Sequence, residues 1–257
     1  MQASSSNKFT NSPLVNVTIL SPNHYGPRDH EIDTISIHCM AGNMSAESCG
    51  NWMAKASTKA SSNYGIDSNG RIGQYVDEKN GSWCTSSRSN DMRAITIEVA
   101  NTIAQHPWPI SDKAYKSLIL LLVDICKRNN IKQLLWQGDK SLVGQVDKQN
   151  MTVHRWFAAK ACPGDYLYNL HGQIAAEVNA QLNQQEEEEE VTQEQFNQMM
   201  TVWLEEQSKL PPEEWSAADR QWAESKGIIK GDGQGRYMYK KPITREEVIA
   251  LLHRVAK

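Results

Sequence analysis

Hydrophobic residues recur along the chain in short and long stretches, and the two kinds alternate. Short stretches rich in β-branched residues predict strands at residues 33–38, 71–76 and 93–99. Longer stretches with apolar positions at helical spacing predict helices at residues 45–59, 111–129 and 164–182. A further short apolar stretch, residues 133–136, is also predicted to be a strand. This alternation indicates an α/β fold with a central mixed sheet flanked by helices.

Local signals set two of the expected boundaries. Ser111 and Asp112 precede the apolar face of the third helix candidate, and serine is a preferred N-cap residue. The sequence Asp-Ser-Asn-Gly at residues 67–70 is a turn signal directly before the strand predicted at 71–76.

An acidic run divides the chain. Residues 184–190 read QQEEEEE, and like charges in a row repel one another and bury nothing. We therefore expect a first domain at residues 1–183, an acidic linker or solvated helix end at 184–190, and a small all-α module at 191–257. In that module Phe196, Met200 and Trp203 fall at helical spacing, and two prolines at 211–212 end the predicted helix.

Composition narrows the class of protein. Hydrophobic residues make up 39% and charged residues 22%, as in ordinary soluble globular proteins. No apolar run reaches the roughly 18 residues of a membrane helix. The N-terminus lacks the basic start and apolar stretch of a secretory signal, so we expect synthesis in the bacterial cytoplasm without a signal peptide. Residues 1–183 hold 17 basic against 15 acidic residues, and no basic stripe with interleaved aromatics appears, which disfavours a nucleic-acid partner.

The cysteines argue against a disulfide framework. They are five in number and irregularly spaced, at positions 39, 49, 84, 126 and 162. Pairing of Cys39 with Cys49 stays open, although a reduced cytoplasm does not favour it.

Two histidines and one cysteine form a candidate metal site. His154 and Cys162 lie eight residues apart, and imidazole nitrogen and thiolate sulfur are both good zinc donors. His38, at the end of a predicted strand, is a candidate third ligand, and three protein ligands plus one water are typical of a catalytic zinc site. Spacing alone does not decide this, because a lone histidine or cysteine is more often a core residue.

Four separated segments resemble a known family in their order along the chain: residues 37–42, 62–72, 94–101 and 154–164. Together they resemble the zinc-dependent N-acetylmuramoyl-L-alanine amidases related to peptidoglycan recognition proteins and to many phage lysins. The resemblance implies that one Zn²⁺ is held by His38, His154 and Cys162. The position of Cys162 is an aspartate in some members.

The same resemblance suggests two catalytic residues. Glu98 stands in an apolar strand, where a carboxylate is costly to bury unless it has a task or a partner. The family's Ile-Glu motif makes Glu98 the expected general base; the alternative is that strand alternation points it at solvent. Lys160, two residues before Cys162, is expected to stabilise the oxyanion, although most lysines only solubilise a surface.

Four further residues are candidate substrate contacts. Ser62 stands where some phage members carry a catalytic tyrosine, and Tyr64 lies two positions further along. Both are interpreted as cleft-lining or structural. Trp83 and Asn101 belong to segments that border the cleft in relatives, and Trp83 either stacks on a sugar or holds a loop.

The end of the chain resembles a single S-layer-homology module, with helices expected within residues 215–231 and 243–254. Thr244 and Glu247 have the spacing of a capping box. In the S-layer family this region also binds secondary cell-wall polymer, which would make Thr244 and Arg245 polymer contacts. The alternative is that residues 191–257 form a homodimer and so complete a core.

These observations predict an endolysin-type, prophage-encoded amidase that cuts bacterial peptidoglycan between N-acetylmuramic acid and L-alanine after release through a holin pore. A recycling amidase would have no need of a wall-anchoring module. A peptidoglycan recognition protein that binds without cutting is the main alternative, and such relatives commonly lose the cysteine ligand. A surface-layer protein is favoured only by the last segment.

Overall fold

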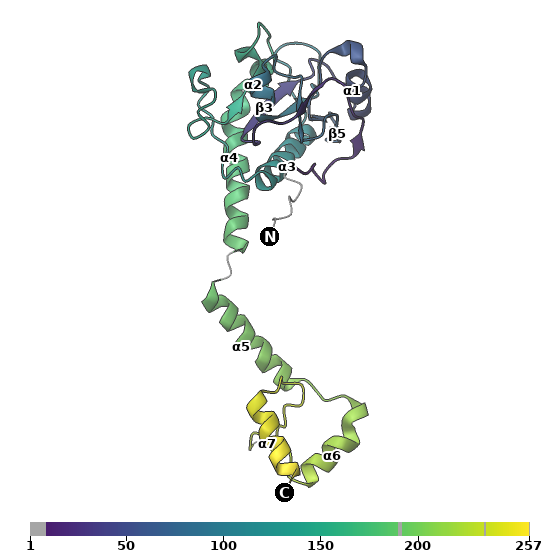
Figure 1. The fold of residues 1–257 in the computed structure, drawn as a ribbon, viewed down its shortest axis with the longest axis vertical. Helices are drawn as coiled ribbons and strands as arrows, with labels where there is room; N and C mark the ends of the chain where they lie inside the picture. Colours follow the sequence, from purple (N-terminus) through teal and green to yellow (C-terminus); the bar gives the residue numbers. More distant parts are fainter. Residues whose placement is uncertain (1–8, 190–191, 234, 257) are drawn as a thin grey trace. The chain divides into compact units, whose positions relative to one another are not determined.

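A computed structural model of the chain describes residues 9–189, 192–233 and 235–256 (Figure 1). It divides into two compact units, residues 1–186 and residues 187–257, which we call unit 1 and unit 2. Along the described residues, no helix has the length and apolar character needed to cross a bilayer.

Unit 1 is built on a six-stranded, mostly parallel sheet with strand order β1-β5-β4-β7-β3-β8. Only the β4–β5 pair is antiparallel. The strands are β1 (Val17–Thr18), β3 (Thr34–Cys39), β4 (Tyr64–Ile66), β5 (Ile72–Gln74), β7 (Ala94–Val99) and β8 (Met151–Thr152). A separate antiparallel pair joins β2 (His24–Pro27) and β6 (Asn80–Ser82).

Strands β3 and β7 lie side by side in the middle of this sheet. Every residue of β3 is buried, as is typical of a parallel strand covered on both faces. Their register pairs Thr34 with Ala94 and continues to Cys39 opposite Val99. The strands predicted at 33–38, 71–76 and 93–99 are confirmed, the second in the shorter form of β5.

Three helices of unit 1 correspond to the predicted ones: α1 (Ala46–Met53), α3 (Asp112–Arg128) and α4 (Gly164–Glu189). Ser111 caps α3, because its side chain accepts a hydrogen bond from the amide of Ala114. A 3₁₀ turn at Ala56–Thr58 follows α1, and a short α2 (Arg88–Asp91) was not predicted.

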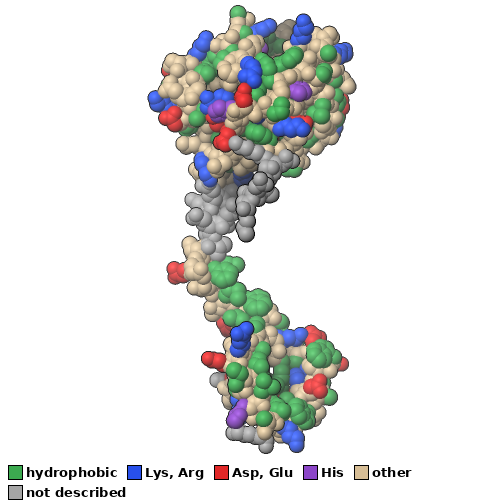
Figure 2. Space-filling model, viewed as in Figure 1, with side chains coloured by type: hydrophobic (Ala, Val, Ile, Leu, Met, Phe, Trp, Pro, Cys, Tyr) green, Lys and Arg blue, Asp and Glu red, His purple; other side chains and the backbone are tan. Residues whose placement is uncertain are grey.

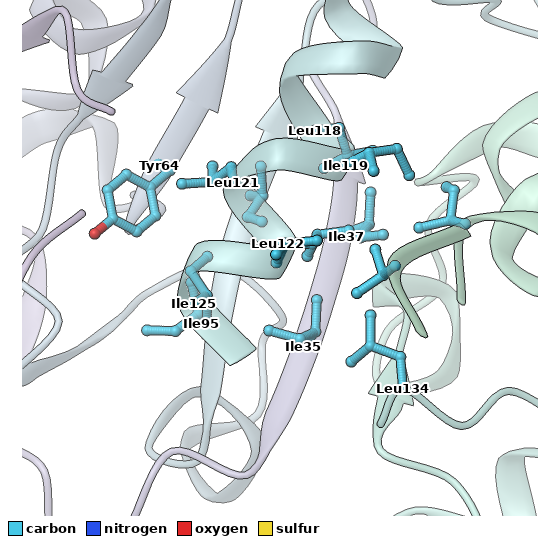
Figure 3. Packing of buried hydrophobic residues seen from close by; sticks show 14 of the residues in the cluster. Ile35, Ile37, Tyr64, Ile95, Leu118, Ile119, Leu121, Leu122, Ile125 and Leu134 are labelled. Carbon is cyan, nitrogen blue, oxygen red and sulfur yellow. The ribbon is translucent and has the colours of Figure 1, made fainter. Parts of the chain in front are cut away.

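Helix α3 covers the sheet and supplies a large share of the core (Figure 3). Its buried leucines lie among the isoleucines of β3 and β7 in one cluster. Leu118, Leu121, Leu122 and Ile125 are all 0% exposed. Full burial of such a side chain stabilises a fold by roughly 1.5–3 kcal/mol, so this face fixes α3 against the sheet.

The strand predicted at residues 133–136 is wrong. Side chains bind its backbone where a neighbouring strand would: the Asn179 carboxamide accepts from the amide of Leu134, and that of Asn150 from the amide of Leu135. Asparagine side chains that bond backbone groups offer the chain an alternative to a strand ladder. The run keeps one backbone bond, from the amide of Asn150 to the carbonyl of Leu135 at 3.2 Å, and it is not assigned as a strand.

The turn predicted at residues 67–70 is confirmed. The amide of Gly70 donates to the carbonyl of Asp67 at 2.9 Å, and Gly70 has a φ of +82°. A Cβ atom there would also stand 2.6 Å from the Ser117 hydroxyl, so glycine is required for both reasons.

Unit 2 is helical, with α5 (Gln193–Lys209), α6 (Ala217–Ser225), α7 (Arg245–Val255) and a 3₁₀ turn at Glu214–Ser216. Helix α5 ends before the two prolines, as predicted, and Thr244 and Glu247 form the predicted capping box. Of the acidic run, residues 184–189 continue α4, while 190–191 lie outside the described residues. Among the described side chains of unit 2, only Ala223 and Ile228 are buried hydrophobics.

Candidate active site

Three loops and strand ends meet at one edge of the sheet of unit 1. His38 lies near the end of β3, Glu98 is its register partner on β7, and His154 follows β8 by two residues. Because β3, β7 and β8 are parallel, their carboxyl ends reach the same edge. Ligand sites in open α/β sheets form at this edge.

The predicted donors come together there. One side-chain donor atom from each of His38, His154 and Cys162 lies within 4.8 Å of the other two. The Cys162 sulfur is 3.4 Å from Nδ1 of His38, and the two imidazole rings are 5.3 Å apart between centroids. The structure thus brings all three predicted ligands into one cluster.

A short loop joins the second and third donors. The amide of Arg155 donates to the carbonyl of Cys162 at 3.1 Å, which closes residues 154–162 on themselves. The Arg155 guanidinium also bonds the carbonyl of Ala161 and the carboxylate of Asp165, at 2.8 and 3.1 Å. These bonds hold His154 and Cys162 at one place although eight residues separate them.

The protonation of these groups suits a metal. Burial lowers the pKa of His38 well below its usual value, and burial together with the charge of Lys160 lowers the pKa of His154. Both imidazoles are therefore neutral near pH 7 and each carries a free lone pair. Two neutral imidazoles and one thiol, clustered and largely buried, are a donor set that fits zinc.

Cys162 also contacts a second cysteine. The backbone amide of Cys39 donates to the Cys162 sulfur at 3.4 Å. A hydrogen bond with the Cys39 thiol, together with burial, raises the pKa of Cys162 well above its usual value. A cation at the site favours the thiolate, so binding would release a proton.

Glu98 points into this cluster and its side chain is only 16% exposed. Its Oε1 lies 4.0 Å from Nδ1 of His38 and accepts a hydrogen bond from the Cys84 thiol at 3.8 Å. Its Oε2 is buried and finds no hydrogen-bond partner among the described residues. Burial raises the pKa of Glu98 well above its usual value. A buried carboxylate with a free oxygen is an expected feature of a functional site.

Lys160 lies on the exposed side of the loop that carries His154 and Cys162. Its ammonium is close enough to lower the pKa of His154. Its predicted role in stabilising an oxyanion stays a prediction.

Ser62 and Tyr64, interpreted as cleft-lining or structural, are 0% exposed, which favours the structural alternative. The Ser62 hydroxyl donates to the carbonyl of Tyr64 at 2.7 Å. The Tyr64 hydroxyl donates to the buried carboxylate of Glu78 at 2.6 Å, which is also paired with Arg128 at 2.7 Å. Both residues are structural, and neither has a surface that a substrate can touch.

Asn101 is also buried, at 0% exposed, and its amide donates to the carbonyl of Trp108 at 2.8 Å. This bond fixes the loop around Trp108, and a contact of Asn101 with substrate stays a prediction. Trp83 is partly exposed and its ring packs edge-on against Tyr25, with centroids 5.9 Å apart. Of the four candidates, Trp83 alone keeps an accessible face.

Two neighbours of the cluster were not expected from the sequence. Cys84 lies against Glu98, and Ser36 lies against His38 with its hydroxyl 3.0 Å from Nε2. Ser36 stands two residues before His38 on the same strand, and this spacing is the signal that could have identified it. The five cysteines are all free thiols, and Cys39 lies against Cys162, not Cys49.

Comparison with protein families gives one match. Residues 28–165 match the family described as N-acetylmuramoyl-L-alanine amidase, and this segment contains the whole cluster. The chain belongs to the N-acetylmuramoyl-L-alanine amidase family, whose members hydrolyse an amide bond of peptidoglycan. No curated protein matches the sequence.

Three solved structures illustrate the similarity of the fold. The structure of PlyL is 15% identical, with 64% of this chain and 96% of that chain covered and a TM-score of 0.47. A mutant endolysin from Bacillus subtilis is 18% identical, with 64% and 99% covered and a TM-score of 0.46. An endolysin N-acetylmuramoyl-L-alanine amidase from Clostridium intestinale is 14% identical, with 66% and 99% covered and a TM-score of 0.42.

Proposed function

We propose that unit 1 is a zinc-dependent, endolysin-type amidase that cuts the bond between the lactyl group of N-acetylmuramic acid and L-alanine. The observation that carries this proposal is the convergence of His38, His154 and Cys162 with Glu98 at one sheet edge. Family membership supports the same bond.

The residues have separate tasks in this reaction. A zinc ion held by the three donors would lower the pKa of a water molecule toward about 7 and polarise the scissile carbonyl. Glu98 accepts a proton from the attacking water while the oxygen of that water bonds to the carbonyl carbon. The C–N bond then breaks, and Glu98 delivers the proton to the departing amine nitrogen. Lys160 offsets the negative charge that develops on the carbonyl oxygen.

The alternative, a recognition protein that binds peptidoglycan without cutting it, needs none of these catalytic features. This chain keeps the three donors and a buried carboxylate whose Oε2 has no hydrogen-bond partner among the described residues. Keeping such a carboxylate costs folding free energy, which a purely binding surface would not require. These observations favour the enzyme.

Digestion of purified cell walls tests the proposed bond. We expect new free amino groups of alanine to appear while the number of reducing sugar ends stays constant, because an amide and no glycosidic bond is cut. New reducing ends would identify a glycosidase. Walls that bind the protein yet release no amino groups would support the recognition protein.

For unit 2 we propose binding to the bacterial wall, in line with the S-layer-homology resemblance. A cavity of about 500 Å³ opens between the 3₁₀ turn, α6 and the segment at 239–240. Trp215 and Trp222 line it and remain 83% and 52% exposed. Tyr239 and Arg220 line it too, with the guanidinium 5.3 Å from the ring centroid. Exposed aromatic faces beside polar groups suit sugar rings.

The two predicted polymer contacts, Thr244 and Arg245, differ in the bonds that they already make. The Thr244 hydroxyl accepts from the amide of Glu247, so its role in the capping box already occupies it. Arg245 is exposed at the first turn of α7 and stays a proposed anion contact.

The proposed homodimer would use a different surface. On α5, Phe196, Met199, Met200 and Trp203 form an exposed apolar stripe, and hydrophobic side chains gather on this part of unit 2 (Figure 2). A stripe of this kind commonly packs against another helix.

Replacing Trp215 and Trp222 together by alanine should weaken binding to whole walls about tenfold, because each exposed indole acts as an anchor. Sedimentation of the full chain with purified walls measures this. Trp203→Ala is the matched control, since Trp203 is 45% exposed but lies on α5 outside the cavity. Cleavage of soluble muropeptides should stay unchanged in both. Unchanged wall binding in the double variant, with a halved solution mass for Trp203→Ala, would support the dimer instead.

A further inference from the structure

We propose that Ser36 is a positioning residue that keeps the ring proton of His38 on Nε2 and so leaves Nδ1 free to bind the metal. The inference deepens the proposed zinc site and rests on it for the identity of the ion. The state of the His38 ring, however, follows from the chain's own hydrogen bonds.

Ser36 and His38 lie two residues apart on β3, so their side chains project to the same side of the sheet. Both are 0% exposed. The Ser36 hydroxyl oxygen lies 3.0 Å from Nε2 of His38 and 3.3 Å from the carbonyl oxygen of Thr152. Because this hydroxyl is buried away from water, these two atoms are its available hydrogen-bond partners.

The direction of the two bonds follows from the number of protons. A carbonyl oxygen can only accept, so both contacts are hydrogen bonds only when the single hydroxyl proton of Ser36 points to Thr152. The hydroxyl then meets Nε2 of His38 with a lone pair, and this contact is a hydrogen bond only when Nε2 carries a proton. Ser36 thus selects one tautomer of its neighbour.

The other ring nitrogen faces the metal donors. Nδ1 of His38 lies 3.4 Å from the Cys162 sulfur and 4.0 Å from Oε1 of Glu98. With the ring proton on Nε2, Nδ1 keeps its lone pair, and one donor atom of each of His154 and Cys162 lies within 4.8 Å of a ring nitrogen of His38. A metal-bound histidine characteristically donates its other N–H to such a partner.

The same hydroxyl also joins two ligand-bearing strands. Ser36 is the register partner of Thr152 on β8, and His154 follows Thr152 by two residues. The bond from Ser36 to the Thr152 carbonyl therefore links the backbone positions of the first and second donors. Loss of the hydroxyl would loosen the ring of His38 and this strand pair together.

His154 has a serine neighbour that lacks this constraint. The Ser86 hydroxyl lies 3.1 Å from Nε2 of His154, but Ser86 is exposed. Water can satisfy that hydroxyl in either direction, so the contact does not dictate the tautomer. The inference is therefore limited to Ser36 and His38.

Ser36→Ala should weaken zinc binding about 10–100-fold, the usual cost of losing such a partner. Competition with a chromogenic chelator measures the zinc affinity, and Ser36→Thr should restore it because the hydroxyl returns. Ser117→Ala is the control: Ser117 lies on α3, and its hydroxyl also donates to a backbone carbonyl, that of Gly70. That variant should bind zinc as the unchanged protein does.

Long-range ¹H–¹⁵N correlation spectra of the metal-free protein give a second readout that depends on neither zinc nor activity. We expect His38 to carry its proton on Nε2, and we expect this preference to disappear in Ser36→Ala. A proton on Nδ1 in the unchanged protein overturns the inference even if Ser36→Ala fails to fold. An Ser36→Ala protein with unaltered tautomer and zinc affinity overturns it as well. If His38 has the expected tautomer but the protein binds no zinc, the zinc proposal is refuted and the inference about Ser36 is not.

Discussion

Replacing Cys162 by alanine should remove stoichiometric zinc and lower the amidase rate by roughly 10³-fold or more. The variant deletes one of three donors that lie within 4.8 Å of one another. Transition-state stabilisation by a bound metal is worth several kcal/mol, and about 1.4 kcal/mol corresponds to a tenfold change in rate. Metal analysis of the purified protein and release of alanine amino groups from walls are the two measurements.

Two further variants sharpen this test. Cys162→Asp supplies a carboxylate donor and should retain zinc, because oxygen ligands also occur in catalytic zinc sites. Cys126→Ala is the control, since Cys126 is also a free thiol but lies in the α3 core away from the cluster. A Cys162→Ala protein that keeps both zinc and its rate would show that the metal is held elsewhere or is not needed.

Replacing Glu98 by glutamine should lower kcat about 10²–10⁴-fold, the usual contribution of a general base, while zinc stays bound. The amide has nearly the same shape as the carboxylate but cannot accept the proton of the attacking water. Separate measurement of kcat and zinc content distinguishes this result from loss of the metal.

Glu47→Gln is the matched control, because Glu47 is an exposed carboxylate on α1 that pairs with Arg71 at 2.7 Å. Its rate should equal that of the unchanged protein. If Glu98→Gln retained a near-normal rate, the base would have to be another group. Tyr64 is excluded from that role by its burial against Glu78.

The central sheet and its covering helix were predictable because each carries its own local signal. Strands β3 and β7 are short β-branched runs, and α3 combines an apolar face with a serine cap. Residues 133–136 show the limit of such signals. The amides of Leu134 and Leu135 donate to asparagine side chains that are distant in sequence, and no local pattern predicts those partners.

The candidate site was predictable only in part, for a similar reason. Resemblance to a family selected His38, whose partners lie more than a hundred residues away in the chain. It also placed Ser62 and Asn101 near the cleft, but which side of a strand or loop faces the cleft is decided by tertiary packing. The buried bonds of Ser62 and Asn101 became visible only with the fold.

The order of the strands has a consequence for the newly made chain. Strand β3, which carries His38, pairs with β7 and β8, and these strands are formed by residues 94–99 and 151–152. The other two proposed ligands, His154 and Cys162, are therefore synthesised only late in unit 1, after β8. Until then the polypeptide holds His38 and Glu98 without them. We therefore expect the nascent chain to have no amidase activity until unit 1 has folded.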